Sequence, residues 1–297
     1  MTETQTIPHV SAEPGILADL LDLTKARLNL LVLITTFVGY WMGATGPIEW
    51  LRLLQAMLAT ALTAAAAAAL NQVWERKIDM LMTRTAQRPL AAGRMQSGPA
   101  LALGLGLGTA GTAWLWLAVN SLSALLAAST VVIYVLIYTP MKRRTAFCTL
   151  VGAVSGAIPP VVGWAAANPH LTLGAWVLFG VLFTWQMPHF LAIAWMYRDQ
   201  YRGAGLVMLK SDDQTGVTTA VTSLIFTLLL TAVTMVPFNT GLAGSMYLGG
   251  ALIINSVFFL AALHFVADRS RPVARRLFFA SILYLPLILG LMVFTKE

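Results

Sequence analysis

Nine apolar runs are the feature that most restricts the fold of this chain. Each is about 20 residues long, the length that an α-helix needs to cross the hydrocarbon core of a bilayer. The mean hydropathy is +0.75 and 10% of the residues are charged, which is typical of a polytopic membrane protein and not of a soluble domain. We therefore predict an all-α membrane protein with spans near residues 28–46, 51–70, 99–118, 122–139, 148–167, 173–195, 217–237, 246–266 and 275–294.

The basic residues predict the orientation in the membrane. Of the 19 lysines and arginines, all but Arg52 and Lys296 fall on one side of the predicted bilayer. By the positive-inside rule that side is cytoplasmic, so the N-terminus is expected inside and the C-terminus outside. Membrane topology then explains the net charge of +7, and we expect the lipid bilayer, not a nucleic acid, as partner.

Residues 1–24 are predicted to form a cytoplasmic tail, and residues 25–297 a single transmembrane domain. The tail holds no arginine and no apolar run, so neither a secretory signal peptide nor a mitochondrial transit peptide is predicted. A bacterial inner membrane is therefore the favoured location. The single cysteine, Cys148, excludes an intramolecular disulfide, and its apolar surroundings indicate a packing role.

A polar motif follows the second predicted span. Asn71, Glu75 and Asp79 are spaced by four residues, so on a helix they would share one face. Mg²⁺ takes oxygen ligands and usually shares them with substrate phosphates, and the arginines downstream, Arg84 and Arg88, suit phosphate binding. The motif indicates a Mg²⁺–diphosphate site at the membrane surface. A solvated charged loop would show the same spacing, so that alternative stays open.

A second charged loop follows the sixth predicted span. It holds Asp199 and Tyr201 among the basic residues Arg198, Arg202 and Lys210. If the two loops face each other across the bundle, Asp199 would add a carboxylate to the Mg²⁺ site; an ordinary cytoplasmic loop is the alternative. The absence of a clear acidic group in mid-membrane favours a site at the cytoplasmic face over a proton-coupled transporter.

Several segments together resemble the UbiA-type intramembrane prenyltransferases. The resemblance covers Leu23-Thr24-Lys25 with Arg27, the Asn71–Leu90 motif, which is specific for that superfamily, and the loop at residues 199–209. Two further segments resemble the branch that farnesylates protoheme IX. These are YTPMKRRTAFCTLVGAVSGAIPPVVGWAA at residues 138–166 and FTWQMPHF at residues 183–190. The resemblance implies nine transmembrane helices around a central cavity, with the active site at the cytoplasmic face.

The resemblance also implies a reaction. The farnesyl group of farnesyl diphosphate would pass to a vinyl group of protoheme IX with addition of water, in a Mg²⁺-dependent step that yields heme O. The implied metal ligands and catalytic residues are Asn71, Glu75, Asp79 and Asp199. The implied diphosphate-binding residues are Arg84, Arg88, Lys142, Arg143 and Tyr201. The expected heme-binding residues are His189 and His264.

The second loop departs from the family pattern. Gln200 stands before Tyr201 where the family has aspartate. Asp199 is one residue away, but on a helix one residue is a rotation of about 100°. For His189 the alternative to heme binding is a hydrogen bond to the backbone of a neighbour.

Three functions remain open from the sequence alone. The first is farnesylation of heme, and the second is prenylation of a quinone-precursor ring by the same metal motif. The third, of a different class, is a transporter or a non-catalytic membrane scaffold. A heme A synthase is considered as a protein partner, although no residue pattern specifies it.

Overall fold

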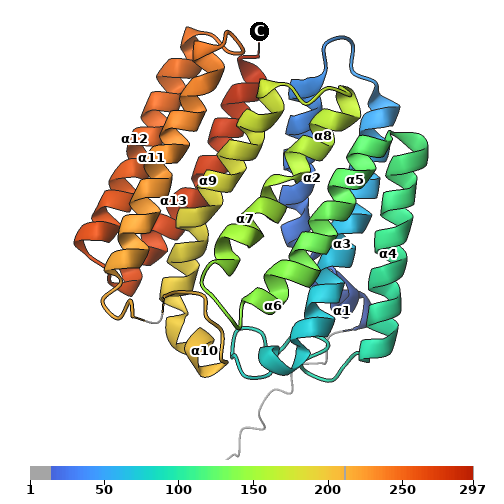
Figure 1. The fold of residues 1–297 in the computed structure, drawn as a ribbon, viewed down its shortest axis with the longest axis vertical. Helices are drawn as coiled ribbons and strands as arrows, with labels where there is room; N and C mark the ends of the chain where they lie inside the picture. The colour runs from blue at the N-terminus through green and yellow to red at the C-terminus, as the bar shows by residue number, and fades with distance from the viewer. Residues whose placement is uncertain (1–14, 211, 297) are drawn as a thin grey trace, which may run out of the picture.

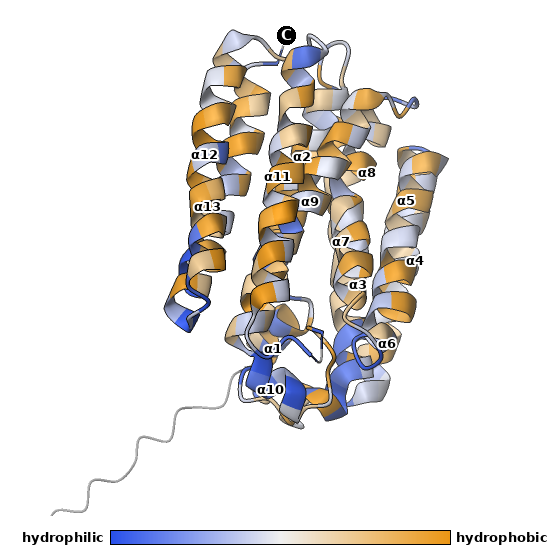
Figure 2. Cartoon of the chain, turned by 60° about the vertical axis from the view of Figure 1, so that its left-hand side comes forward, coloured by the Kyte–Doolittle hydropathy of each residue, from blue (hydrophilic) through white to orange (hydrophobic). Residues whose placement is uncertain are grey.

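The chain forms a bundle of α-helices in a computed structural model that describes residues 15–210 and 212–296. Nine helical segments in this part of the chain are long and apolar enough to cross a membrane, which confirms the predicted fold class. They stand side by side (Figure 1), and apolar residues extend along most of their length (Figure 2). The elements are α1 (Ile16–Leu23), α2 (Ala26–Gly43), α3 (Trp50–Asp79), α4 (Ser97–Ala118), α5 (Ser121–Val132), η1 (Ile133–Tyr138), α6 (Thr139–Met141), α7 (Cys148–Ala157), α8 (Pro159–Ala167), α9 (Leu173–Met196), α10 (Arg198–Gly203), α11 (Val217–Asn239), α12 (Ser245–Ala267) and α13 (Arg271–Phe294).

The second span, α3, is longer than its apolar run. The run ends at Leu70, whereas the helix continues to Asp79 and contains 30 residues. At 1.5 Å per residue it is about 45 Å long, compared with about 30 Å for the hydrocarbon core. The last turns of α3 therefore carry the polar motif to the end of the bundle where α1, α6 and α10 lie (Figure 1).

Two spans are built from more than one helical element. The fourth passes from α5 through the π-helix η1 into α6. The fifth changes from α7 to α8 at Pro159, because a proline has no backbone N–H for the preceding turn and is well accommodated at the start of a helix. Short π-helical turns are frequent at functional sites, so the side chains of η1 are candidates for a site.

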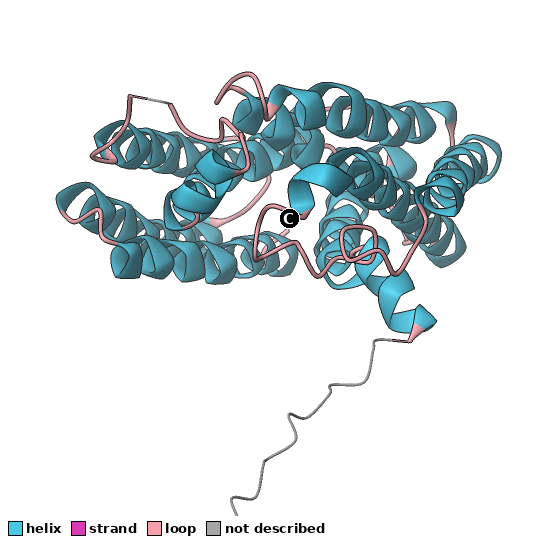
Figure 3. Ribbon diagram, turned by 90° about the horizontal axis from the view of Figure 1, so that it is seen from below, coloured by secondary structure: helices cyan, strands magenta, loops and turns pink. Residues whose placement is uncertain are grey.

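The charged end of the bundle is crossed by loops and short helices (Figure 3). The positive-inside rule predicts that this end faces the cytoplasm. Helix α1 lies there, where the sequence predicts only a polar tail; residues 1–14 of that tail lie outside the described residues. The Asp19 carboxylate of α1 pairs with Arg94 at 2.8 Å, and Gln72 of α3 donates to the carbonyl oxygen of Asp22 at 2.8 Å. These contacts attach α1 to the polar end of α3 and to the segment between α3 and α4.

Helices α2 and α8 approach each other closely. A Cβ atom added to Gly39 of α2 would lie 1.8 Å from the carbonyl oxygen of Pro160, and one added to Gly163 of α8 would lie 1.9 Å from that of Thr36. Small residues allow membrane helices to pack at such short range. The glycines therefore fix the spacing of α2 and α8.

We expect the substitution Gly39→Ala to destabilise the protein by about 3 kcal/mol, because the added methyl group meets backbone atoms that cannot rotate away. Thermal unfolding in detergent measures the effect. Gly249→Ala in α12 is the matched control, since a Cβ atom there meets no heavy atom within 4 Å. Equal melting temperatures for the two variants would contradict the packing argument.

Candidate active site

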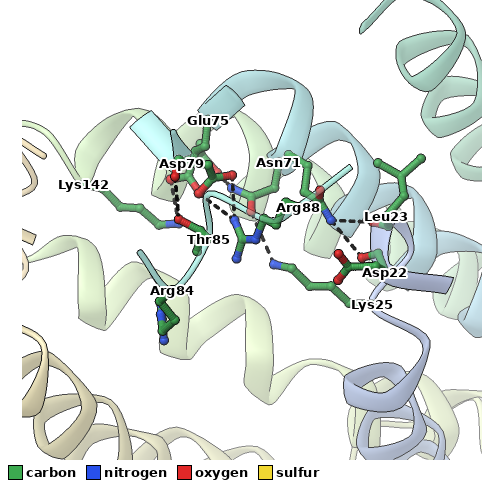
Figure 4. Close-up of polar contacts among 12 residues, drawn as sticks. Asp22, Leu23, Lys25, Asn71, Glu75, Asp79, Arg84, Thr85, Arg88 and Lys142 are labelled. Carbon is green, nitrogen blue, oxygen red and sulfur yellow. Dashed lines mark hydrogen bonds and ion pairs between the residues drawn. The ribbon is translucent and has the colours of Figure 1, made fainter. Parts of the chain in front are cut away.

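The last three turns of α3 line a polar pocket of about 140 Å³ at the charged end of the bundle. Asn71, Glu75 and Asp79 share one face of the helix (Figure 4), as their spacing predicts, and each is at most 5% exposed. Buried carboxylates are costly unless they are paired. The partners of these three side chains therefore define the site.

Both carboxylates of the motif pair with cations from later segments. Lys142 donates to Oε1 of Glu75 at 2.8 Å, and Nη1 of Arg88 lies 2.8 Å and 2.7 Å from the two carboxylate oxygens of Asp79. The amide of Asn71 donates to Oγ1 of Thr139 at 3.0 Å. The motif thus joins α3 to α6 and to the turns that follow α3.

Lys25 is a member of this site that the sequence reasoning missed as a site residue. Its ammonium lies 3.5 Å from Oδ1 of Asn71, and its side chain lines the pocket. Its backbone is left-handed, with φ of 49°, where non-glycine residues are uncommon. The family resemblance included Lys25 but implied no role for it, and no local pattern in the sequence places its ammonium beside Asn71.

The second loop contributes through Tyr201 of α10. The guanidinium of Arg84 donates to the hydroxyl of Tyr201 at 2.9 Å and lies over the ring of Tyr197, 5.1 Å from its centroid. Burial raises the pKa of Tyr201, although Arg84 opposes the shift, so the hydroxyl remains neutral and accepts this hydrogen bond. Arg84 is thereby held at the pocket, and no carboxylate among the described residues pairs with it.

Two tyrosines of η1 complete the wall of the pocket. Tyr134 and Tyr138 pack with ring centroids 5.2 Å apart, and the ammonium of Lys142 lies 4.4 Å from the centroid of Tyr138. Burial disfavours the charged form of Lys142, but the ring of Tyr138 and the carboxylate of Glu75 beside the ammonium outweigh it and raise the pKa of Lys142. Lys142 is therefore the cationic partner of Glu75. The four-residue spacing of the tyrosines is visible in the sequence, but nothing there relates it to the polar motif.

The charges of the pocket suit a polyanion. Its described lining contains the cations Lys25, Arg84, Arg88 and Lys142 but only the carboxylates Glu75 and Asp79. A bound diphosphate could take over contacts that the two carboxylates now make. The freed oxygens of Glu75 and Asp79, with the carbonyl of Asn71, fit Mg²⁺, which typically uses one or two protein carboxylates plus substrate phosphates.

Asp199 and Arg143 are not brought to this pocket. Asp199 is 62% exposed and forms an ion pair with Arg271 of α13, and Arg143 is exposed. Among the described residues, no group of three or more acidic, histidine or cysteine side chains could hold a metal ion. The expected second acidic cluster around Asp199 is therefore not formed, because α10 turns Tyr201 inward and Asp199 outward.

The two candidate heme ligands also lie away from the pocket. Nδ1 of His189 is 2.7 Å from Oγ of Ser281 in α13, and the ring stacks with Trp185 at a centroid distance of 5.1 Å. His264 is exposed on α12. His189 thus bonds to a neighbouring helix, but its partner is a side-chain hydroxyl and not the backbone oxygen that the alternative predicted.

Fold and site together define a membrane-embedded bundle that places an anion-binding, metal-compatible pocket at the end of an apolar interior. Residues 32–283 match the UbiA prenyltransferase family. The chain is 44% identical over 287 residues to a protoheme IX farnesyltransferase of Solibacter usitatus, covering 94% of this chain and 98% of the relative. It is 38% identical to one of Koribacter versatilis, covering 98% of each chain. The chain therefore belongs to the UbiA prenyltransferase family.

Solved structures show the same fold at low sequence identity. A digeranylgeranylglyceryl phosphate synthase superposes with a TM-score of 0.77 at 15% identity, covering 94% of this chain and 98% of that one. A UbiA homologue from Archaeoglobus fulgidus bound to DMAPP and Mg²⁺ superposes with a TM-score of 0.66 at 14% identity, covering 92% and 99%. The nine-helix arrangement is thus that of the UbiA fold.

Proposed function

We propose that this chain transfers the farnesyl group of farnesyl diphosphate to a vinyl group of protoheme IX, with addition of water, to give heme O. The observation that carries the proposal is the pocket with an excess of cations at the end of an apolar bundle. It suits an amphiphile with a diphosphate head and an isoprenoid tail. Relatives that are 38% to 44% identical over nearly the whole chain, all named protoheme IX farnesyltransferase, support the choice of donor and acceptor.

The proposed site uses Mg²⁺ bound by Asn71, Glu75 and Asp79 together with the diphosphate. The metal would supply Lewis-acid stabilisation of the leaving diphosphate. Cations of the protein would also stabilise the leaving diphosphate, from the other sides of the pocket, since fixed charges at a developing anion are an effective form of catalysis. These cations are Lys25, Arg84, Arg88 and Lys142. The structural relative that holds DMAPP with Mg²⁺ is consistent with this assignment.

The bond changes follow from these charges. The C1–O bond of farnesyl diphosphate breaks and the electron pair leaves with the diphosphate. Tyr134 and Tyr138 line the same pocket, and their rings would suit the resulting allylic cation, because aromatic rings attract cations. A vinyl carbon of the heme attacks C1, water adds to the cation left on the porphyrin side chain, and one proton passes to solvent.

The proposed location is a bacterial inner membrane, with the pocket on the cytoplasmic side. The positive-inside distribution of lysine and arginine supports this orientation. A pocket on the cytoplasmic side would also give the donor's diphosphate head, which is water-soluble, direct access to Mg²⁺.

The test is a product analysis with the full chain in membranes. With Mg²⁺, farnesyl diphosphate and protoheme IX, we expect heme whose mass has increased by one farnesyl group plus water. Chelation of Mg²⁺ by EDTA should abolish the product, and added Mg²⁺ should restore it. Prenylation of hydroxybenzoate in place of heme would instead establish the quinone-precursor function. No product with either acceptor would favour a transporter or scaffold.

A further inference from the structure

A second and larger cavity opens beside the polar pocket. This cleft, of about 590 Å³, lies between α7, α9 and α11. Its floor is apolar, with Leu150 from α7, Met187 and Leu191 from α9, and Phe226 from α11 packed in one cluster. Its volume lies in the range of ligand sites in proteins, about 300–1,000 Å³. The cleft is therefore suited to a large apolar molecule.

The rim of the cleft carries two cations, Arg144 and Lys210. Both are exposed, and neither has an ion-pair partner among residues 15–210 and 212–296. Of the two aspartates at the rim, Asp213 accepts hydrogen bonds from the first turn of α11, while Asp212 is exposed. An apolar ligand with two anionic groups at one edge would match an apolar floor below two unpaired cations.

The cleft and the polar pocket share one wall. Met208 lines both cavities, and the adjacent backbone N–H of Val207 donates to the carbonyl oxygen of Lys142 at 2.6 Å. Lys142 in turn pairs with Glu75 in the polar pocket. A ligand in the cleft would therefore lie next to the donor site, as a second substrate must.

We infer that this cleft binds the acceptor, a tetrapyrrole with two propionates, with its macrocycle over the apolar floor and its propionates at Arg144 and Lys210. The inference rests on the proposed function and locates its acceptor away from His189 and His264. A lipid acyl chain is the competing occupant of an apolar cleft in a membrane protein, but it would not require the two cations.

The test is a titration of the purified full-length chain with protoheme IX, followed by its visible absorption. We expect Arg144→Gln/Lys210→Gln to weaken binding about tenfold, because two ion pairs are lost. The control Arg275→Gln/Arg276→Gln removes the same charge from the cytoplasmic end of α13 and should leave binding unchanged. The dimethyl ester of protoheme IX, which lacks the propionate charges, should bind the wild type and the cleft variant equally.

A second variant tests the apolar floor. Leu150→Trp should fill the cleft and weaken heme binding, with Leu101→Trp on the exposed face of α4 as control. Affinity for farnesyl diphosphate should be unchanged in both, which also shows that they are folded. Equal binding of protoheme IX by wild type and Arg144→Gln/Lys210→Gln would overturn the inference, whatever the result for Leu150→Trp.

The titration tests the cleft assignment and the product analysis tests the proposed function, so either one can be overturned without the other. Farnesylated heme from the wild type, together with normal heme binding by the cleft variants, would overturn the cleft assignment alone. Cleft-dependent heme binding without any farnesylated product would overturn the proposed function alone.

Discussion

Asp79→Asn is expected to lower the rate of farnesyl transfer by about 10²–10³-fold, in line with the loss of one preorganised electrostatic contact at a reacting group. The substitution removes the charge that would hold Mg²⁺, and it replaces one of the two oxygens that Arg88 contacts at 2.8 Å and 2.7 Å by an NH₂ group, which cannot accept. Initial rates at saturating farnesyl diphosphate and protoheme IX measure the effect.

Asp268→Asn is the control for this experiment. Asp268 lies at the same end of the bundle, after α12, and accepts hydrogen bonds from Ser270 alone among the described residues. We expect its rate to match the wild type. A similar loss in both variants would indicate a general effect of acidic charge at the membrane surface, and retention of activity by Asp79→Asn would reject the site.

The second large effect is expected on stability. Lys142→Met leaves the Glu75 carboxylate without its 2.8 Å partner in a buried setting, which should destabilise the fold by about 3–5 kcal/mol. Glu75→Gln/Lys142→Met removes both charges and should recover most of that loss, while remaining inactive. Unfolding in detergent gives the stability, and the coupling between the two positions follows from the double-mutant cycle.

The ion pair between Asp199 and Arg271 is the comparison for the same cycle. Its side chains are 62% and 58% exposed, so solvent screens the pair. Breaking it should change the free energy of unfolding by less than about 1 kcal/mol. A coupling as large as that of Glu75 with Lys142 would contradict the view that burial, and not the ion pair itself, makes the first pair important.

The sequence predicted those parts of the site that depend on local periodicity. Asn71, Glu75 and Asp79 share a helix face because their spacing equals about one turn, and the nine spans follow from apolar length. The contact of Lys142 with Glu75 joins residues 67 positions apart, and no local pattern contains that information. The family resemblance supplied Lys142 instead.

The sequence predicted least well which side of its helix each functional side chain faces. Asp199 and Tyr201 are two residues apart, about 200° on a helix, so only one of them can face the pocket, and it is Tyr201. Similarly, the position of His189 along α9 predicted its depth in the membrane but not the helix that it contacts. Because α9 is apolar on all sides, the sequence did not indicate that His189 faces α13.

The length of α3 has a consequence for how the two products would separate. The helix exceeds the hydrocarbon thickness by about 15 Å, which is the length of its polar last turns. Bond cleavage would thus take place at a phase boundary, with the diphosphate on the aqueous side and the isoprenoid on the lipid side. Each product would partition into its own solvent, and this separation would oppose the reverse reaction.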